Sequence, residues 1–163
     1  MEINNIITTI NESLKEKVVE VTNPADRRIF VKVEKSNLLE VIKFLRDTFG
    51  FTHLSTITGL DTGTSFELLY HFSGPGAVLT VRALTDKDNP VLPSICSVIP
   101  GAILYEREIQ DMFGIKIDNI PDSRPLVLPD DWEPGNYPLR KDWKFERKPE
   151  VIPSKKRVDG LKG

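Results

Sequence analysis

Prolines divide this chain into two parts that cannot share one kind of structure. Only two of the 12 prolines precede residue 90, and the other ten lie between Pro90 and Pro153. Each proline removes a backbone donor and fixes one dihedral angle, so regular structure is unfavourable where prolines recur every few residues. We therefore predict an α+β domain over residues 1–114, including a late acidic helix, and an irregular docking segment with a basic tail over residues 115–163.

The N-terminal quarter has the spacing of one helix followed by two strands. The helical stripe consists of Ile3, Ile6, Ile7, Ile10 and Leu14, which recur at intervals of three and four residues. Residues Val18 to Val21 and Ile29 to Val33 alternate with polar residues, which is typical of strands. Asn23-Pro24-Ala25-Asp26 between them has the composition of a turn.

A second helix is predicted between Ser36 and Gly50. The Ser36 side chain can cap its first turn, and Gly50 favours a left-handed stop. Its buried face is predicted to consist of Leu38, Leu39, Ile42, Leu45 and Phe49.

Three further strands are predicted at Thr52 to Thr58, Phe66 to Phe72 and Val78 to Leu84, separated by GLDTGTS and by SGPG, which is typical of a hairpin loop. The fold class that follows is α+β: a mostly antiparallel sheet with helices on one face, then a helix and a long irregular Pro-rich C-terminal segment. A chain of 163 residues can bury the core of one such domain.

The late helix is predicted from Ala102 to Phe113, with Pro100 near its start and Gly114 just beyond its end. We expect Arg107 to pair with Asp111 one turn later. Three carboxylates on this helix, Glu106, Glu108 and Asp111, allow three interpretations. They could bind a metal, although Glu106 and Glu108 point in different directions on a helix; they could be solvated; or they could pair with arginines of the irregular segment or of another chain.

Other sequence features exclude several kinds of chemistry. No motif for phosphate, dinucleotide or acyl chemistry occurs. His53 and His71 have no ligand-type spacing, and we expect both to be structural. Cys96 is the only cysteine, so an internal disulfide and a four-ligand iron–sulfur site are excluded, and we expect a small buried side chain.

Net charge and hydropathy limit the partners of this chain. A net charge of -2 gives no general attraction to nucleic acid. Residues 144–163 hold seven Lys or Arg against three acids, a charge of +4, which leaves -6 elsewhere; this basic tail is either solvated or a strap along a partner. The absence of a disulfide suits the cytoplasm. The sequence predicts neither a signal peptide nor a membrane span, so we expect membrane association to come through another subunit.

Residues 121–142 mix charged residues with aromatic and aliphatic anchors. The cations are Arg124, Arg140 and Lys141, the acids include Asp122 and Asp142, and the anchors are Leu126, Leu128, Trp132, Tyr137, Leu139 and Trp143. This composition is typical of interface cores, and prolines reduce the entropy lost on docking. The segment either docks on another protein or folds back on its own sheet.

Three linked motifs, YEREIQDMFGIKI, PDSRPLVLPDDW and YPLRKDW, resemble the signature of the 30 kDa (C) subunit family of respiratory complex I. The same family has homologues in membrane-bound, energy-converting NiFe hydrogenases. Residues matching the signature, together with two aromatic anchors, are Glu106, Arg107, Glu108, Asp111, Phe113, Gly114, Pro121, Asp122, Arg124, Leu128, Trp132, Tyr137, Pro138, Leu139, Arg140, Lys141 and Asp142. The resemblance implies roles in assembly for them and no catalytic, metal or cofactor residue.

The resemblance further implies a cofactor-free subunit, without activity of its own, at the cytoplasmic face of the cell membrane. It would dock on the large hydrogenase-like (49 kDa-type) subunit, with a small iron–sulfur subunit and membrane-arm subunits in the same complex. Iron–sulfur clusters, and in hydrogenases a NiFe centre, would belong to those partners. Ile120 and Pro125 depart from the family pattern and favour the hydrogenase branch. The alternatives are an NADH (or other reduced carrier):quinone oxidoreductase and, remotely, a free-standing metal-dependent enzyme.

The same resemblance leads us to expect that Arg140→Ala impairs assembly more than folding of residues 1–90, through an unpaired charge at the interface.

Overall fold

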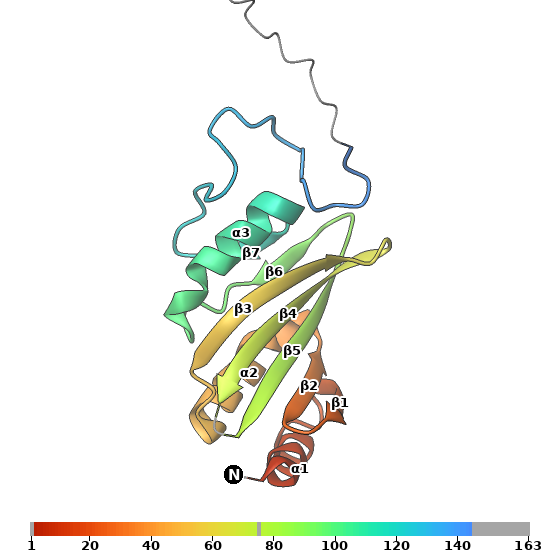
Figure 1. Ribbon diagram of the computed structural model, residues 1–163, viewed down its shortest axis with the longest axis vertical. Helices are drawn as coiled ribbons and strands as arrows, with labels where there is room; N and C mark the ends of the chain where they lie inside the picture. The colour runs from red at the N-terminus through yellow and green to blue at the C-terminus, as the bar shows by residue number, and fades with distance from the viewer. Residues whose placement is uncertain (1, 75, 145–163) are drawn as a thin grey trace, which may run out of the picture.

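The computed structural model describes residues 2–74 and 76–144, and its centre is a five-stranded sheet with the order β1-β2-β5-β4-β3 (Figure 1). The strands are β1 (Val18–Ala25), β2 (Arg28–Val33), β3 (His53–Asp61), β4 (Ser65–Gly74) and β5 (Ala77–Asp86). All neighbours pair antiparallel except β2 and β5, which are parallel. The basic tail over residues 145–163 and Pro75 of the predicted hairpin loop lie outside the described residues.

Helices cover one face of this sheet. The buried face is marked on β4 by Phe66, Leu68, Tyr70 and Phe72, which alternate along the strand and are at most 1% exposed. Helices α1 (Ile3–Ser13) and α2 (Leu38–Phe49) pack there through the predicted apolar stripes, although Val41 is buried and Leu39 only partly. The predicted α+β class and mostly antiparallel sheet are thereby confirmed.

The opposite face of the sheet carries polar pairs. Glu67 on β4 accepts a hydrogen bond from Arg82 on β5 at 2.8 Å. His71 bridges Thr58 and Thr80 across three strands at 3.2 and 3.0 Å, and burial lowers the pKa of its ring. These contacts agree with the structural role predicted for His71.

Two local predictions were wrong. Helix α2 begins at Leu38 after the 3-10 turn η1 (Lys35–Asn37), and Ser36 makes no capping hydrogen bond, because it lies inside that turn. The first turn is displaced too: β1 continues to Ala25, and the chain reverses at Arg27, whose φ is 64°. The stop at Gly50 is confirmed, with φ of 77°.

Helix α3 (Ile103–Phe113) follows the 3-10 turn η2 (Pro100–Ala102) and packs at the β3 edge of the sheet. It sits close because β3 has glycine there: a Cβ on Gly59 would lie 2.5 Å from a ring carbon of Phe113. The Phe113 ring meets Phe66 edge to face at 6.0 Å. A small parallel sheet of β6 (Val91–Pro93) and β7 (Lys116–Asp118) lies beside α3 (Figure 1).

Beyond β7, residues 119–144 contain no helix or strand, as predicted. We call residues 119–144 the C-terminal segment. It lies at the end of the molecule opposite the N-terminus, next to α3 (Figure 1).

Candidate functional site

Two charged side chains of α3 hold the first half of the C-terminal segment. Oδ2 of Asp111 accepts hydrogen bonds from the backbone amides of Leu126, Val127 and Leu128 at 2.8, 2.7 and 3.3 Å. Arg107 donates to the carbonyl oxygens of Arg124 and Pro125 at 2.7 and 2.9 Å. The carboxylate thus accepts hydrogen bonds from amides, and the guanidinium donates hydrogen bonds to carbonyls. Together they let the helix orient the backbone of residues 124–128.

These contacts replace the predicted pair between Arg107 and Asp111. Both side chains form hydrogen bonds with the C-terminal segment, and Arg107 also forms an ion pair with Asp122 at 3.6 Å. The interpretation that the helix carboxylates pair with arginines of this segment is wrong for Asp111, which binds backbone amides. The isolated motif could not show this, since its partners lie fifteen or more residues away. Pairing of these carboxylates with arginines of another chain stays a prediction.

Asp122 fixes the turn that enters this region. Its carboxylate accepts the Arg124 amide at 3.0 Å and the Arg124 side chain at 2.7 to 3.1 Å. These hydrogen bonds hold the pKa of Asp122 well below its usual range. The Arg124 guanidinium is nevertheless largely exposed.

A second anchor joins the C-terminal segment to the end of α3. The Leu139 amide donates to the Met112 carbonyl at 3.1 Å, and Nε of Arg140 donates to the Phe113 carbonyl at 2.6 Å. The Arg140 guanidinium also lies 4.3 Å from the Tyr137 ring centre and 5.0 Å from that of Phe66. All these contacts of Arg140 are within the chain, so its loss would act first by releasing this anchor; a contact with another subunit stays a prediction.

Gly114 is required by this second anchor for two reasons. It ends α3 with φ of 64°, a conformation that favours glycine. A Cβ at this position would also lie 2.2 Å from Cζ of Tyr137. The signature glycine is therefore both a helix stop and the floor on which Tyr137 rests.

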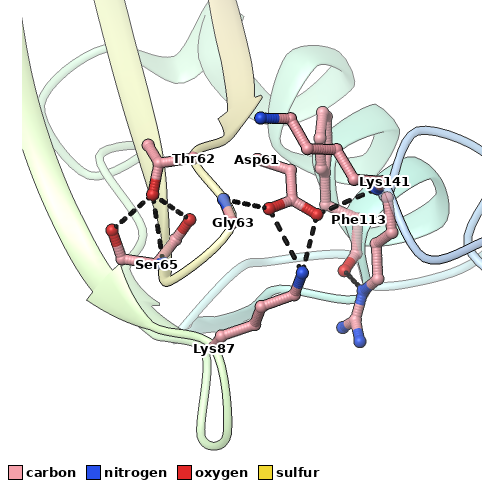
Figure 2. A network of polar contacts seen from close by, with 8 residues as sticks. Asp61, Thr62, Gly63, Ser65, Lys87, Phe113 and Lys141 are labelled. Carbon is pink, nitrogen blue, oxygen red and sulfur yellow. Dashed lines mark hydrogen bonds and ion pairs between the residues drawn. The ribbon is translucent and has the colours of Figure 1, made fainter.

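A third anchor, which no sequence pattern predicted, centres on Asp61 at the end of β3. Figure 2 shows its carboxylate between Lys87, Gly63 and Lys141. It accepts the Lys141 amide at 2.9 Å and the Lys87 ammonium at 2.9 and 3.2 Å. Burial alone would raise the pKa of Asp61, but these hydrogen bonds outweigh it and lower the pKa to about 2.

Glu106 is turned into the molecule. Its side chain is 1% exposed and accepts the Ser94 hydroxyl and the Ile95 amide, both at 2.7 Å, and the Cys96 thiol at 3.2 Å. Burial, with a further contribution from Glu106, raises the pKa of Cys96 to about 11, so the thiol is a neutral donor. Cys96 is the small buried residue that was predicted, whereas the interpretation of a solvated carboxylate is wrong for Glu106.

The remaining signature residues differ in exposure. Phe113 is buried in the core, and the half-buried members are Leu128, Trp132, Tyr137 and Pro138. The exposed members are Glu108, Pro121, Leu139, Lys141 and Asp142. The structure therefore brings together Arg107, Asp111, Asp122 and Arg124 around one half of the segment, and Gly114, Tyr137 and Arg140 around the other, while Glu106 and Glu108 face apart.

Neither a metal centre nor a membrane span is visible in the described part of the chain. Across residues 2–74 and 76–144, no three His, Cys, Asp or Glu side chains gather as a metal would require. No helix in those same residues has the length and apolarity to cross a bilayer.

Comparisons with known proteins place these observations among relatives. The profile of the family described as respiratory-chain NADH dehydrogenase, 30 Kd subunit, matches residues 31–149. A subunit of the F(420)H(2) dehydrogenase of Methanosarcina mazei is 35% identical over 88% of this chain and 92% of its own length. The beta subunit of the membrane-bound hydrogenase of Pyrococcus furiosus is 34% identical over 79% of this chain and 78% of its own length.

Two further matches are a much longer relative and a solved structure. Formate hydrogenlyase subunit 5 of Escherichia coli is 34% identical over 83% of this chain, but the match spans only 25% of that relative. Among solved structures, a chain of the membrane-bound sulfane sulfur reductase, described as an archaeal respiratory membrane complex, has a TM-score of 0.76. The two chains are 25% identical, and the match covers 86% of this chain and 85% of that one.

Proposed function

This chain belongs to the 30 kDa subunit family of respiratory-chain NADH dehydrogenase, and from that premise we propose that it is a cofactor-free assembly subunit of a membrane-bound, ion-translocating redox complex. Its relatives are subunits of an F(420)H(2) dehydrogenase, a membrane-bound hydrogenase and a formate hydrogenlyase. In the proposal, redox chemistry takes place in other subunits, and this chain contributes a preformed surface that they recognise.

One observation carries the proposal: α3 and the C-terminal segment expose large apolar side chains on a backbone that is already fixed. Leu104, Leu126, Val127 and Leu139 are between 41% and 54% exposed. Asp111 and Arg107 hold the backbone around Leu126 and Val127, so little conformational entropy remains to be lost on docking. Exposed apolar anchors on an ordered frame are typical of a protein interface.

The proportions of the Escherichia coli relative support a large partner. This chain matches a quarter of formate hydrogenlyase subunit 5, so in that relative a similar region is part of a much longer polypeptide. In the present protein we infer a non-covalent contact with a large hydrogenase-like (49 kDa-type) subunit. A small iron–sulfur subunit and membrane-arm subunits complete the proposed complex, which holds the iron–sulfur clusters and lies at the cytoplasmic face of the membrane.

We favour the energy-converting hydrogenase type for this complex, with a NiFe centre in the large subunit. Support comes from the membrane-bound hydrogenase and formate hydrogenlyase relatives. A second candidate is an oxidoreductase that takes electrons from a reduced carrier, favoured by the F(420)H(2) dehydrogenase relative, which matches almost its full length. Identification of the large subunit separates the two, because only the hydrogenase type binds nickel.

Isolation of the native complex tests this proposal. An affinity tag on this chain, with membranes extracted in mild detergent, is expected to recover a large hydrogenase-like subunit together with iron. After dissociation, the purified chain is expected to contain no iron and to lack visible absorbance. Two results would contradict the proposal: extraction of this chain from the membranes without any other subunit, or iron that stays with the chain after separation from every partner.

A further inference from the structure

A groove opens between α3 and the loop of residues 129–137, with a volume of about 260 Å³. Gln110 and Asp111 of α3 form one wall, and Leu128, Trp132, Glu133 and Tyr137 are among the residues of the other. We call it the Trp132 groove. Pro125 and Leu128, which line the groove, flank Leu126 and Val127 in the chain.

The shape of the Trp132 groove is fixed before anything binds. The Trp132 amide donates to the Pro129 carbonyl at 3.0 Å, and the indole Nε1 donates to the Asn136 carbonyl at 2.8 Å. Asn136 in turn donates to Glu133 at 3.1 Å. Prolines at 129 and 134 stiffen the same loop. The indole also lies beside the Trp143 ring, with 6.4 Å between the ring centres, so it is held from several sides as a wall of the groove.

Among the described residues, those that line the groove include carboxylates and no Lys or Arg. From Pro125 to Leu139 the sequence has three acids, Asp130, Asp131 and Glu133, and no base. Two other carboxylates of the site have cations: Asp61 has Lys87 and Asp122 has Arg124. In the described residues, by contrast, no Lys or Arg forms an ion pair with Asp130 or Glu133, both of which line the groove. A cation that enters would meet two carboxylates that no described side chain neutralises.

We propose that the Trp132 groove receives a cationic side chain, an arginine in the first instance, from the large subunit; this inference rests on the proposed function. A guanidinium stacks on an indole face and bonds carboxylates at its edge, which matches an aromatic wall beside Asp130 and Glu133. Trp and Arg are also enriched among the few residues that carry most of the binding energy of an interface. The exposed Leu126 and Val127 require apolar residues next to that arginine in the partner.

Removing the two carboxylates tests the charge requirement in the native complex. The full chain carrying Asp130→Asn with Glu133→Gln is compared with a control carrying Glu12→Gln with Asp88→Asn, which removes two exposed acids outside the groove. The tagged chains are isolated from membranes at rising salt. We expect the groove variant to retain about tenfold less large subunit than the control at moderate salt, a loss of about 1.4 kcal/mol.

A photo-crosslink identifies the occupant. With p-benzoylphenylalanine in place of Asp131, we expect a crosslink to a large-subunit peptide that contains an arginine or lysine. Crosslinking to residues 145–163 of the same chain, or equal retention of the large subunit by the groove variant and the control, would overturn the inference and leave the proposed function standing. If the unaltered chain recovers no large subunit, the proposed function itself fails.

Discussion

The body of the molecule and the C-terminal segment are stabilised in different ways. In the body, side chains such as Leu68 and Leu79 are fully buried between sheet and helices. In the C-terminal segment no side chain between residues 119 and 144 is buried, and its conformation depends on Asp111, Arg107, Asp61 and Arg140. The comparison shows that the body has its own apolar core, whereas the segment is held in shape by polar contacts and keeps its apolar surface exposed.

Shortening a core side chain of the body should have the largest effect on stability. Leu68→Ala removes a fully buried side chain from the centre of β4 and is expected to lower the free energy of unfolding by about 2 to 5 kcal/mol. Urea unfolding followed by far-UV circular dichroism measures it. A loss below about 1 kcal/mol would show that the body does not depend on apolar burial in the way described.

Gly114→Ala should disturb the segment more than the body. Both Gly114 and Gly50 have positive φ, so alanine costs about 1 kcal/mol at either position. Only at Gly114 does the new Cβ meet a neighbour, Tyr137 at 2.2 Å, whereas nothing lies within 4 Å of it at Gly50. We expect Gly114→Ala to lose about 1 to 3 kcal/mol more than Gly50→Ala.

Hydrogen exchange locates that difference. In Gly114→Ala the amides of Leu139 and Arg140 should exchange faster, because the Leu139 amide donates to Met112 of α3 and the Arg140 amide donates to Tyr137, the residue that the new Cβ would displace. Equal stability and equal exchange in the two glycine variants would mean that Tyr137 does not rest on Gly114.

Asp61 joins the body to the C-terminal segment, and its ionisation should make the stability of the protein sensitive to acid. Its pKa is lowered from 3.8 to about 2. Because the folded-state value lies below the unfolded one, its contribution, at most about 2 kcal/mol, is complete above the unfolded pKa and is lost as pH falls through about 2. Asp61→Asn should therefore flatten the fall in stability between pH 4 and pH 2.

The hydrogen bonds with Arg124 also lower the pKa of Asp122, so Asp122 also loses stabilisation in acid and only part of the slope should disappear in Asp61→Asn. Urea unfolding at a series of pH values measures the slope. Identical slopes in the variant and the unaltered chain would remove Asp61 from this role.

The smallest effect is expected from Asp111→Ala. The change leaves the amides of residues 126–128 without their acceptor, at a cost of about 1 kcal/mol confined to the segment. Amide exchange should accelerate at 126–128 and stay unchanged on β4 and β5. Glu108→Ala, an exposed carboxylate three residues away, is the control and should change neither. Faster exchange across the sheet would show that segment and body are not separable.

Local patterns predicted most of the body. The apolar stripe ending at Leu14, the alternation on β4 and the stop at Gly50 each depend on neighbours a few residues away, so the sequence displays them. The errors arose where tertiary contacts decide. Ser36 has a capping side chain but lies in a 3-10 turn. Arg107 was predicted to pair with Asp111 but forms hydrogen bonds with the C-terminal segment.

The polar anchors were beyond prediction for the same reason. Asp61 and Lys141 are 80 residues apart, and nothing in the sequence around Asp61 distinguishes it from other turn-forming acids. Glu106 and Glu108 look alike in the sequence, yet one is buried against residues 94–96 and the other is exposed. The family signature located the segment that matters, but the contacts that shape it required the fold.

The most direct test of the docking account compares two valines of equal exposure. Val127 in the C-terminal segment and Val19 on β1 are each 53% exposed. A buried interface charge is costly, so Val127→Asp in the tagged full chain should lose most of the co-purifying large subunit while Val19→Asp retains it, with unfolding free energies of both variants close to that of the unaltered chain. Equal retention of the large subunit by the two variants would contradict the account.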